Sequence, residues 1–320
     1  MSLIINRTQS LEKIELMREK KACMAIFCSA SHWNTEAILL AAHRYAKKKG
    51  IKNIPISIAM TFNYPHMQQA QRVTYSKNAK YGFISNMKHL QALCAYNDSP
   101  YKNVAVLPHL DHANPIRDAW ALTEGIPYLS SVMFDTQDIK DQNALTLTKE
   151  YVNKYHNDVL IEGIMEQLAV GDGTLSIKTD NYIDKAVNFV NKTNIDFLVA
   201  DLGTEQQSDS IGKVEYLSQR AINLTKALKK PMLVLHGTSS LSKNQMKSIK
   251  NDGIIRVNMW TRIVRESGQY AANNIVNRYE DIKKGKFEAT DSRQYIYDSI
   301  EKAAEIMEEI MDIIGYGNLA

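Results

Sequence analysis

The feature that most constrains the fold of this chain is a series of eight short apolar runs, each separated from the next by a stretch of helical character. The runs do not alternate with polar positions, as expected for strands that are covered on both faces. Strands that alternate with helices indicate a parallel sheet, because parallel strands need a crossover between them. Closure into a (β/α)8 TIM barrel is the simplest arrangement of eight such units. The predicted strands are 22–28, 54–61, 104–112, 128–135, 159–165, 197–203, 231–237 and 254–260.

An open, doubly wound sheet is the alternative arrangement. No Gly-x-Gly-x-x-Gly sequence follows the first predicted strand, so nothing supports a dinucleotide-binding version of that fold. Capping residues predict where helices begin and end. We expect Asn34 or Thr35 to cap the second helix and Gly50 to end it. A further helix is expected over 115–124, because Pro115 suits a first helical turn and a glycine follows the stretch.

We expect a single domain over 1–320, with the barrel at about 22–280 and additional C-terminal helices at about 288–316. The last of these stretches is amphipathic, with apolar residues at helical spacing from Ile296 to Ile314.

Composition and charge narrow the class of protein. The chain is 44% hydrophobic and 23% charged, which is typical of a soluble globular protein. Its 39 basic and 35 acidic residues are interspersed, so no nucleic-acid partner is expected. We also expect no membrane span and no signal peptide. Cys23, Cys28 and Cys94 form no disulfide or metal pattern, so free thiols in a reducing, cytoplasmic setting are expected.

Polar side chains end the third predicted strand. The apolar run from Val104 is followed by His109, Asp111 and His112. A polar group that is buried without a partner costs several kcal/mol, so such groups at a strand end indicate a site or a hydrogen-bonded plug. In a barrel, the carboxyl ends of the strands are where active sites form.

Other polar residues are expected at the same mouth of the barrel. They come from the fifth to the eighth strands and the residues after them: Glu162, Asp201, Glu205, Gln206, His236, Asn258 and Thr261. Imidazoles from two strands, together with an oxygen ligand, suit a divalent metal such as zinc. Glu162 is either such a ligand or one partner of a salt bridge inside the barrel with Arg256. Asp111 is suited to move protons, and the turn after His236 to bind an anion.

These residues resemble the class II, metal-dependent fructose-bisphosphate aldolases and related ketose-bisphosphate aldolases. His109-Leu110-Asp111-His112 is similar to the His-Leu-Asp-His segment of that family. Three further segments are similar to its later strands, namely Ser131–Asp135, Ile161–Glu162 and Leu235–Ser239. The resemblance extends from about Ala22 to Thr261.

The resemblance implies a role for each matching residue. His112 and His236 are implied as ligands of Zn2+ or another divalent metal, and Glu162 as a metal ligand or a carboxylate near it. Asp111 is implied as the acid/base at the substrate hydroxyl. Substrate or phosphate contacts are implied for Thr61, Gly203, Gly237, Ser239, Asn258 and Thr261.

The sequence departs from the family at two loops. Gln206 stands where the family has its third histidine ligand, so it is the candidate for that ligand position, and Gln207 replaces a glycine. The glycine- and acid-rich lid of the family is matched only by 169–173, where Asp172 is the candidate lid acid.

The expected activity is reversible, metal-dependent aldol cleavage of a ketose phosphate, by a homodimer or homotetramer. Two alternatives stay open. One is a relative that binds a sugar phosphate without zinc. The other is an aldolase for a singly phosphorylated or unphosphorylated substrate.

Overall fold

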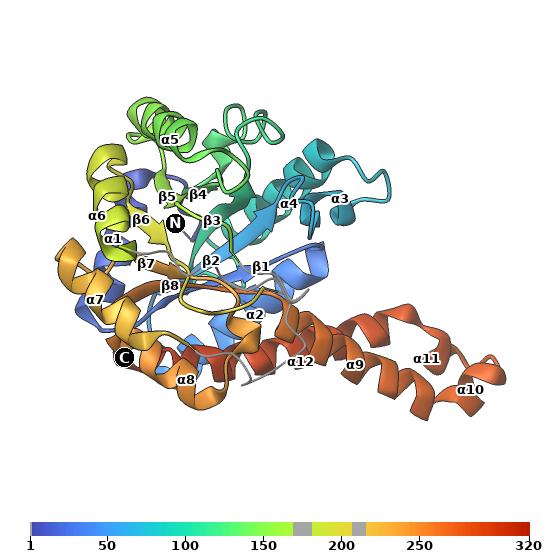
Figure 1. Cartoon of the computed structure of the whole chain (residues 1–320). Helices are drawn as coiled ribbons and strands as arrows, with labels where there is room; N and C mark the ends of the chain where they lie inside the picture. Colours follow the sequence, from blue (N-terminus) through green and yellow to red (C-terminus); the bar gives the residue numbers. More distant parts are fainter. Residues whose placement is uncertain (1, 169–180, 207–215) are drawn as a thin grey trace.

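The computed structural model describes residues 2–168, 181–206 and 216–320. Within these residues, eight parallel strands close into a barrel in sequence order, with β1 beside β8 (Figure 1). The predicted (β/α)8 TIM barrel is therefore confirmed. The strands are β1 (Met24–Cys28), β2 (Ile54–Thr61), β3 (Val104–Ala113), β4 (Ser131–Phe134), β5 (Leu160–Ile164), β6 (Phe197–Val199), β7 (Leu233–Leu235) and β8 (Ile254–Met259).

Helices surround this barrel, and those nearest the C-terminus extend it (Figure 1). The α-helices of the described residues are α1 (Arg7–Glu19), α2 (His32–Lys49), α3 (Gln69–Val73), α4 (Ala79–Cys94), α5 (Asp141–Tyr155), α6 (Tyr182–Thr193), α7 (Ser218–Leu228), α8 (Lys243–Ser248), α9 (Thr261–Asn277), α10 (Tyr279–Lys283), α11 (Phe287–Thr290) and α12 (Ser292–Ile313). Helix α12 packs against α2 and α9. Together with α10 and α11, the ends of α9 and α12 that lie away from the barrel form an arm that projects from it (Figure 1).

The core lies inside the barrel and between the barrel and its helices. Every residue of the eight strands is buried, which explains why the strands read as continuous apolar runs. The chain returns to the barrel at its C-terminus, where the Tyr316 hydroxyl donates to the Pro55 carbonyl at 2.9 Å and accepts from the Ala25 amide at 3.0 Å. Burial of this side chain ties the C-terminal helices to β1 and β2.

The prediction of a helix over 115–124 is wrong. Hydrogen-bonded turns occupy this stretch, and a short 3-10 helix follows at Ile126–Tyr128. The Asp118 carboxylate accepts the backbone N–H groups of Asn63 at 3.0 Å and Asn114 at 2.9 Å. Such side-chain bonds offer the backbone an alternative to helical pairing, which the proline and glycine pattern did not reveal.

The start of α2 also differs from the prediction. Ser31, not Asn34 or Thr35, caps α2, because its hydroxyl accepts the Asn34 N–H at 3.0 Å. Gly50 ends α2 in the left-handed conformation at φ 73°, as predicted.

The three cysteines are free thiols, and all three are buried. In the described residues, no helix combines the length and the apolarity that crossing a membrane requires.

Candidate active site

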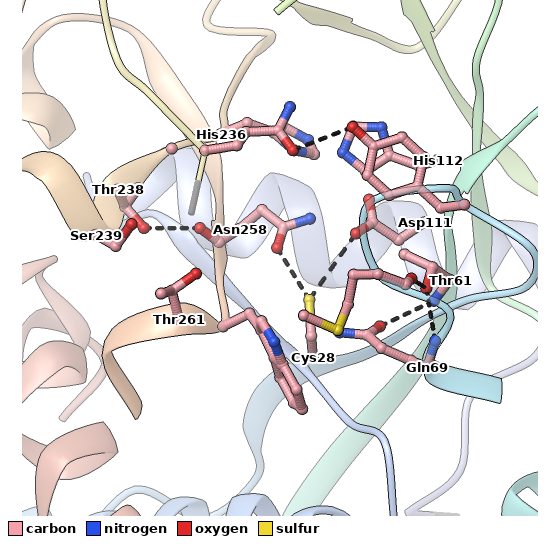
Figure 2. A pocket seen from close by; sticks show the side chains of 15 residues that line it. Cys28, Thr61, Gln69, Asp111, His112, His236, Thr238, Ser239, Asn258 and Thr261 are labelled. Atoms are coloured by element: carbon pink, nitrogen blue, oxygen red, sulfur yellow. Dashed lines mark hydrogen bonds between the residues drawn. The ribbon is translucent and has the colours of Figure 1, made fainter. Parts of the chain in front are cut away.

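A pocket opens at the carboxyl ends of the strands, where the sequence predicted the polar groups to gather (Figure 2). The predicted site residues that line it are Thr61, Asp111, His112, Gln206, His236, Gly237, Ser239, Asn258 and Thr261. Glu162 lies deeper in the barrel. Gly203 is not one of the described residues that line the pocket. Asp172 lies outside the described residues.

His112 is held from two sides. Its Nδ1 atom lies 2.8 Å from Oδ2 of Asp135, which follows β4, and the Tyr64 ring stacks on the imidazole at 4.1 Å between ring centroids. The backbone of His112 has a φ of 48°, a left-handed conformation that is rare for residues with a side chain. Burial by itself lowers the pKa of His112, but the charges of Asp111 and Asp135 outweigh it, so this pKa is raised.

His236 follows β7, and its ring lies 4.9 Å from that of His112 between centroids. The Thr204 hydroxyl donates to the His236 carbonyl at 2.7 Å and thereby ties the end of β7 to the loop after β6. Burial and the neighbouring His112 lower the pKa of His236 to about 4. The imidazole of His236 is therefore neutral at physiological pH, the state in which histidine binds metals.

Asp111, His112 and His236 form a group that can hold a metal ion. One ligand atom from each lies within 4.8 Å of the other two, and all three side chains are buried. The Nε2 atom of His236 is buried without a hydrogen-bond partner, which is costly unless something else occupies it. Because Nδ1 of His112 pairs with Asp135, its Nε2 is left for a cation, the usual arrangement of metal-binding histidines. These observations fit a divalent cation.

Asp111 ends the pairing of β3 with β2, opposite Thr61. Its Oδ1 atom is buried without a hydrogen-bond partner, and its Oδ2 atom lies 3.9 Å from the Cys28 sulfur. Burial and the Asp111 charge raise the pKa of the Cys28 thiol, which therefore keeps its proton. A buried carboxylate with one oxygen free is suited to accept a proton from a bound molecule.

Glu162 forms the salt bridge with Arg256 that the sequence offered as one alternative. Both groups are buried inside the barrel, and His109 Nε2 lies 3.6 Å from the second Glu162 oxygen. Burial raises the pKa of Glu162 to about 7 although the Arg256 charge opposes this. Glu162 is not in the group formed by Asp111 and the two pocket histidines, and its role at a metal stays a prediction.

Thr61 is already hydrogen-bonded within the loop that follows β2. Its hydroxyl donates to the Met67 carbonyl and accepts the Gln69 N–H at 3.0 Å, while the Gln69 side chain accepts the Thr61 N–H at 2.9 Å (Figure 2). These bonds fold the 62–69 loop over one side of the pocket and place Tyr64 against His112.

Hydroxyls and a helix start gather on the opposite side of the pocket. Figure 2 shows Ser239 and Thr261 near Asn258. Thr261 is the first residue of α9, so the partial positive charge of the helix start faces this side. Gly237 has a φ of 69°, and a Cβ there would lie 2.7 Å from the Glu205 carbonyl carbon. Only glycine therefore lets the two loops approach this closely.

Gln206 reaches the pocket with a different chemistry from an imidazole. Its amide oxygen accepts from the Tyr64 hydroxyl at 3.4 Å, and its Nε2 atom is buried without a partner. Asn258 has the same pattern, because its amide oxygen accepts from the Cys28 thiol at 3.0 Å and its Nδ2 atom has no partner.

Sequence reasoning assigned no role to Asp135, Tyr64 or Cys28, although all three contact predicted site residues. Asp135 and Cys28 sit at strand ends, where the same argument that found His236 applies to them. Tyr64 lies in a loop, and no pattern in the sequence indicates that its ring turns toward His112.

A closed barrel with imidazoles and a carboxylate at the carboxyl ends of its strands defines a TIM-barrel protein with an enzyme-like site. Residues 15–318 match the sequence model of the family "Fructose-bisphosphate aldolase class-II". The chain therefore belongs to the class II fructose-bisphosphate aldolase family, as the motifs suggested.

Individual relatives are distant. The chain is 28% identical over 223 residues to a fructose-bisphosphate aldolase of Streptococcus pneumoniae, covering 66% of this chain and 72% of the relative. It is 27% identical over 228 residues to one of Streptococcus pyogenes, covering 68% and 74%.

Solved structures share the fold at lower identity. Fructose-bisphosphate aldolase of Campylobacter jejuni superimposes with a TM-score of 0.74 at 16% identity, covering 98% of this chain and 95% of the other. The YdjI aldolase of Escherichia coli K12 gives 0.65 at 18% identity, covering 98% and 97%.

Proposed function

We propose that this protein is a lyase that catalyses reversible aldol cleavage of a ketose phosphate and depends on a divalent metal, with zinc the expected ion. Family membership supports the reaction class. The observation that carries the proposal is the close group of Asp111, His112 and His236, which combines a proton acceptor with two metal-binding imidazoles in one pocket.

His112 and His236 are the proposed ligands. A divalent cation held by them supplies Lewis-acid polarisation of a carbonyl oxygen. Asp135 orients the His112 ring and favours its basicity, as carboxylates beside metal-binding histidines do. The Thr204 hydroxyl keeps His236 in place by donating a hydrogen bond to the His236 carbonyl.

Asp111 is the proposed acid/base. Its free Oδ1 takes the proton from the hydroxyl on C4 of the ketose while the C3–C4 bond breaks. The electron pair of the O–H bond forms the carbonyl of the released aldehyde, and the C3–C4 pair moves toward the ketone carbonyl. A proton from water then adds to C3 and completes the second product, while Asp111 returns its proton to the solvent. The same steps in reverse join the two products.

The side of the pocket with Gly237, Ser239 and Thr261 is the proposed phosphate subsite. Hydroxyls and the start of α9 suit an anion. This is the one phosphate subsite that we propose among the described residues, so a singly phosphorylated ketose is the second candidate substrate beside the bisphosphate of the family.

We also propose a homodimer or homotetramer whose interface includes the arm. Six large apolar or aromatic side chains of the arm are exposed, namely Tyr270, Ile275, Val276, Tyr279, Phe287 and Tyr297. An exposed set of this kind is typical of a protein interface. Sedimentation of the wild type and of Phe287→Glu tests this, with a lower oligomeric state expected for the variant.

The experiment that tests the function is an assay of the zinc-loaded protein against a panel of ketose phosphates and bisphosphates, with the released aldehyde trapped and identified. We expect cleavage of at least one ketose phosphate and loss of cleavage after the metal is removed by a chelator. A zinc-loaded protein that cleaves none of them contradicts the proposed function. Cleavage that survives complete metal removal contradicts its metal dependence.

A further inference from the structure

Two primary amides in the pocket share an unusual arrangement. In Gln206 and in Asn258, the amide oxygen accepts a hydrogen bond from a neutral donor, while the amide nitrogen is buried without a partner. Gln206 is 9% exposed and Asn258 is 8% exposed, so both nitrogens are withdrawn from bulk water. A buried donor without a partner costs about 1–3 kcal/mol. Two such donors in one pocket therefore indicate that a bound molecule completes them.

In both amides, the oxygen faces a neutral donor and the NH2 end is left for the pocket. The Tyr64 hydroxyl is 3.4 Å from the Gln206 oxygen, and the Cys28 sulfur is 3.0 Å from the Asn258 oxygen. Phenol and thiol groups carry a proton at neutral pH, so each can donate to an oxygen. Rotating the Asn258 amide by half a turn would direct its NH2 group at the Cys28 sulfur, which is a weak acceptor. Rotating either amide would remove its NH2 group from the present direction.

Both donors are themselves fixed. The Tyr64 ring is nearly parallel to the His112 ring, at an interplanar angle of 8°, and its side chain is buried. Cys28 is the last residue of β1 and is buried beside Asp111. Figure 2 shows the Asn258 side chain between Cys28 and His236, with its nitrogen directed into the space beside Asp111.

We propose that Tyr64 and Cys28 are positioning residues, each of which holds one pocket amide so that its NH2 group donates to an oxygen atom of the bound substrate. This inference rests on the proposed function. The substrate class is a ketose or its cleavage products, which carry carbonyl and hydroxyl oxygens on adjacent carbons. Gln206 and Asn258 supply a donor each, and Asp111 supplies the acceptor.

This assignment gives Gln206 a role other than that of a metal ligand. A ligand would turn its oxygen toward the cation, but here the oxygen is bonded to Tyr64. The group left to face the pocket is an N–H donor, which cannot coordinate a cation. The position that holds a third imidazole in the family pattern is thus used to bind substrate in this protein.

The experiment measures two affinities for each variant by calorimetry: that of the apoprotein for Zn2+, and that of the zinc-loaded protein for dihydroxyacetone phosphate. We expect Tyr64→Phe and Gln206→Leu to weaken binding of this probe about fivefold to tenfold, the loss of one hydrogen bond. Their affinity for Zn2+ is expected to fall by less than about threefold, because no ligand is lost. Tyr101→Phe is the matched control, since it removes the hydroxyl of another buried tyrosine, which donates to Glu36 at 3.2 Å.

Cys28 is tested by a conservative rescue. Cys28→Ala removes the donor and is expected to weaken probe binding, whereas Cys28→Ser keeps an O–H donor and is expected to restore most of it. Cys94→Ser, at the buried end of α4, controls for replacing a buried thiol. If the role of Cys28 were merely structural, Cys28→Ser would bind the probe no more tightly than Cys28→Ala, because serine is the more polar replacement.

Three results would overturn the inference. Loss of Zn2+ affinity by about tenfold or more in Gln206→Leu would make Gln206 a metal ligand. Unchanged probe affinity in both Tyr64→Phe and Cys28→Ala, with the wild type binding the probe, would contradict this assignment alone. A wild-type protein that binds Zn2+ but not the probe would contradict the proposed function together with it.

Discussion

The imidazole of His112 and the carboxylate of Asp135 lie 2.8 Å apart, and both side chains are buried where β3 and β4 end. Burial by itself raises the pKa of Asp135, but its hydrogen bond with His112 outweighs this, so the pKa is lowered. The pair therefore carries opposite charges whenever His112 is protonated, and it fixes which ring nitrogen faces the pocket.

Asp135→Asn keeps the shape of the Asp135 side chain and removes its charge. We expect its affinity for Zn2+ to fall about tenfold to a hundredfold in a calorimetric titration. Equal affinities of variant and wild type would show that Asp135 does not support the site.

Replacement of Asp111 separates proton transfer from metal binding. Asp111→Asn leaves the side-chain volume unchanged but removes the proton acceptor, so turnover is expected to fall by about a hundredfold or more. The zinc content of the purified variant is expected to match that of the wild type, because His112 and His236 are the proposed ligands. A variant that retains most of its turnover would remove Asp111 from the mechanism.

The pH dependence of zinc binding follows from the two imidazoles. The pKa of His112 is raised above 6.5, so a proton competes with the cation there as the pH falls through and below neutrality. The pKa of His236 is lowered to about 4, so this ring stays neutral over the same range. Between about pH 7 and pH 5, we therefore expect the affinity to fall about tenfold per pH unit, with one proton displaced per ion. A fall of a hundredfold per unit would mean that both rings titrate together.

Gly237 and Gly50 allow a matched test of the close contact behind the pocket. Both have a positive φ, but a Cβ on Gly50 meets nothing within 4 Å, whereas one on Gly237 would meet the Glu205 backbone at 2.7 Å. Urea unfolding is expected to show a loss of about 1 kcal/mol in Gly50→Ala from the backbone conformation alone. Gly237→Ala is expected to lose about 2–4 kcal/mol because the clash is added. Equal losses would show that the loop after β6 yields without cost.

The Glu162–Arg256 pair tests the interior of the barrel. Arg256→Met leaves the Glu162 carboxylate buried without its partner, and the free energy of unfolding is expected to fall by about 3–5 kcal/mol at neutral pH. The double variant with Glu162→Leu also removes the carboxylate and is expected to recover much of this loss. A double variant that is less stable than Arg256→Met would contradict this explanation.

The predicted role of Glu162 at a metal is tested by the zinc affinity of Glu162→Gln. If Glu162 has this role, the variant binds zinc clearly more weakly than the wild type.

The barrel was predictable because its strands are buried on both faces, so each leaves an apolar run that a short pattern detects. Predictions failed where side chains bond to nearby backbone groups, as Asp118 does in place of the expected helix. A second bond joins the Asp118 carboxylate to the Asn63 N–H, and Asn63 is distant in sequence.

In the site too, residues at strand ends were predictable and contacts between loops were not. His112 and His236 were predicted because each ends a strand, and the topology of the barrel brings strand ends together. The contact between Tyr64 and Gln206 was not predictable, because it joins two loops whose paths the strand pattern does not define.

The most direct test of this account is the zinc content of the purified protein after dialysis, compared between the wild type and the double variant of His112→Ala and His236→Ala. We expect one tightly bound zinc ion per chain in the wild type, and neither bound zinc nor aldol cleavage in a folded double variant. A wild type that binds no metal, or a double variant that keeps its metal and its turnover, would contradict the proposed centre.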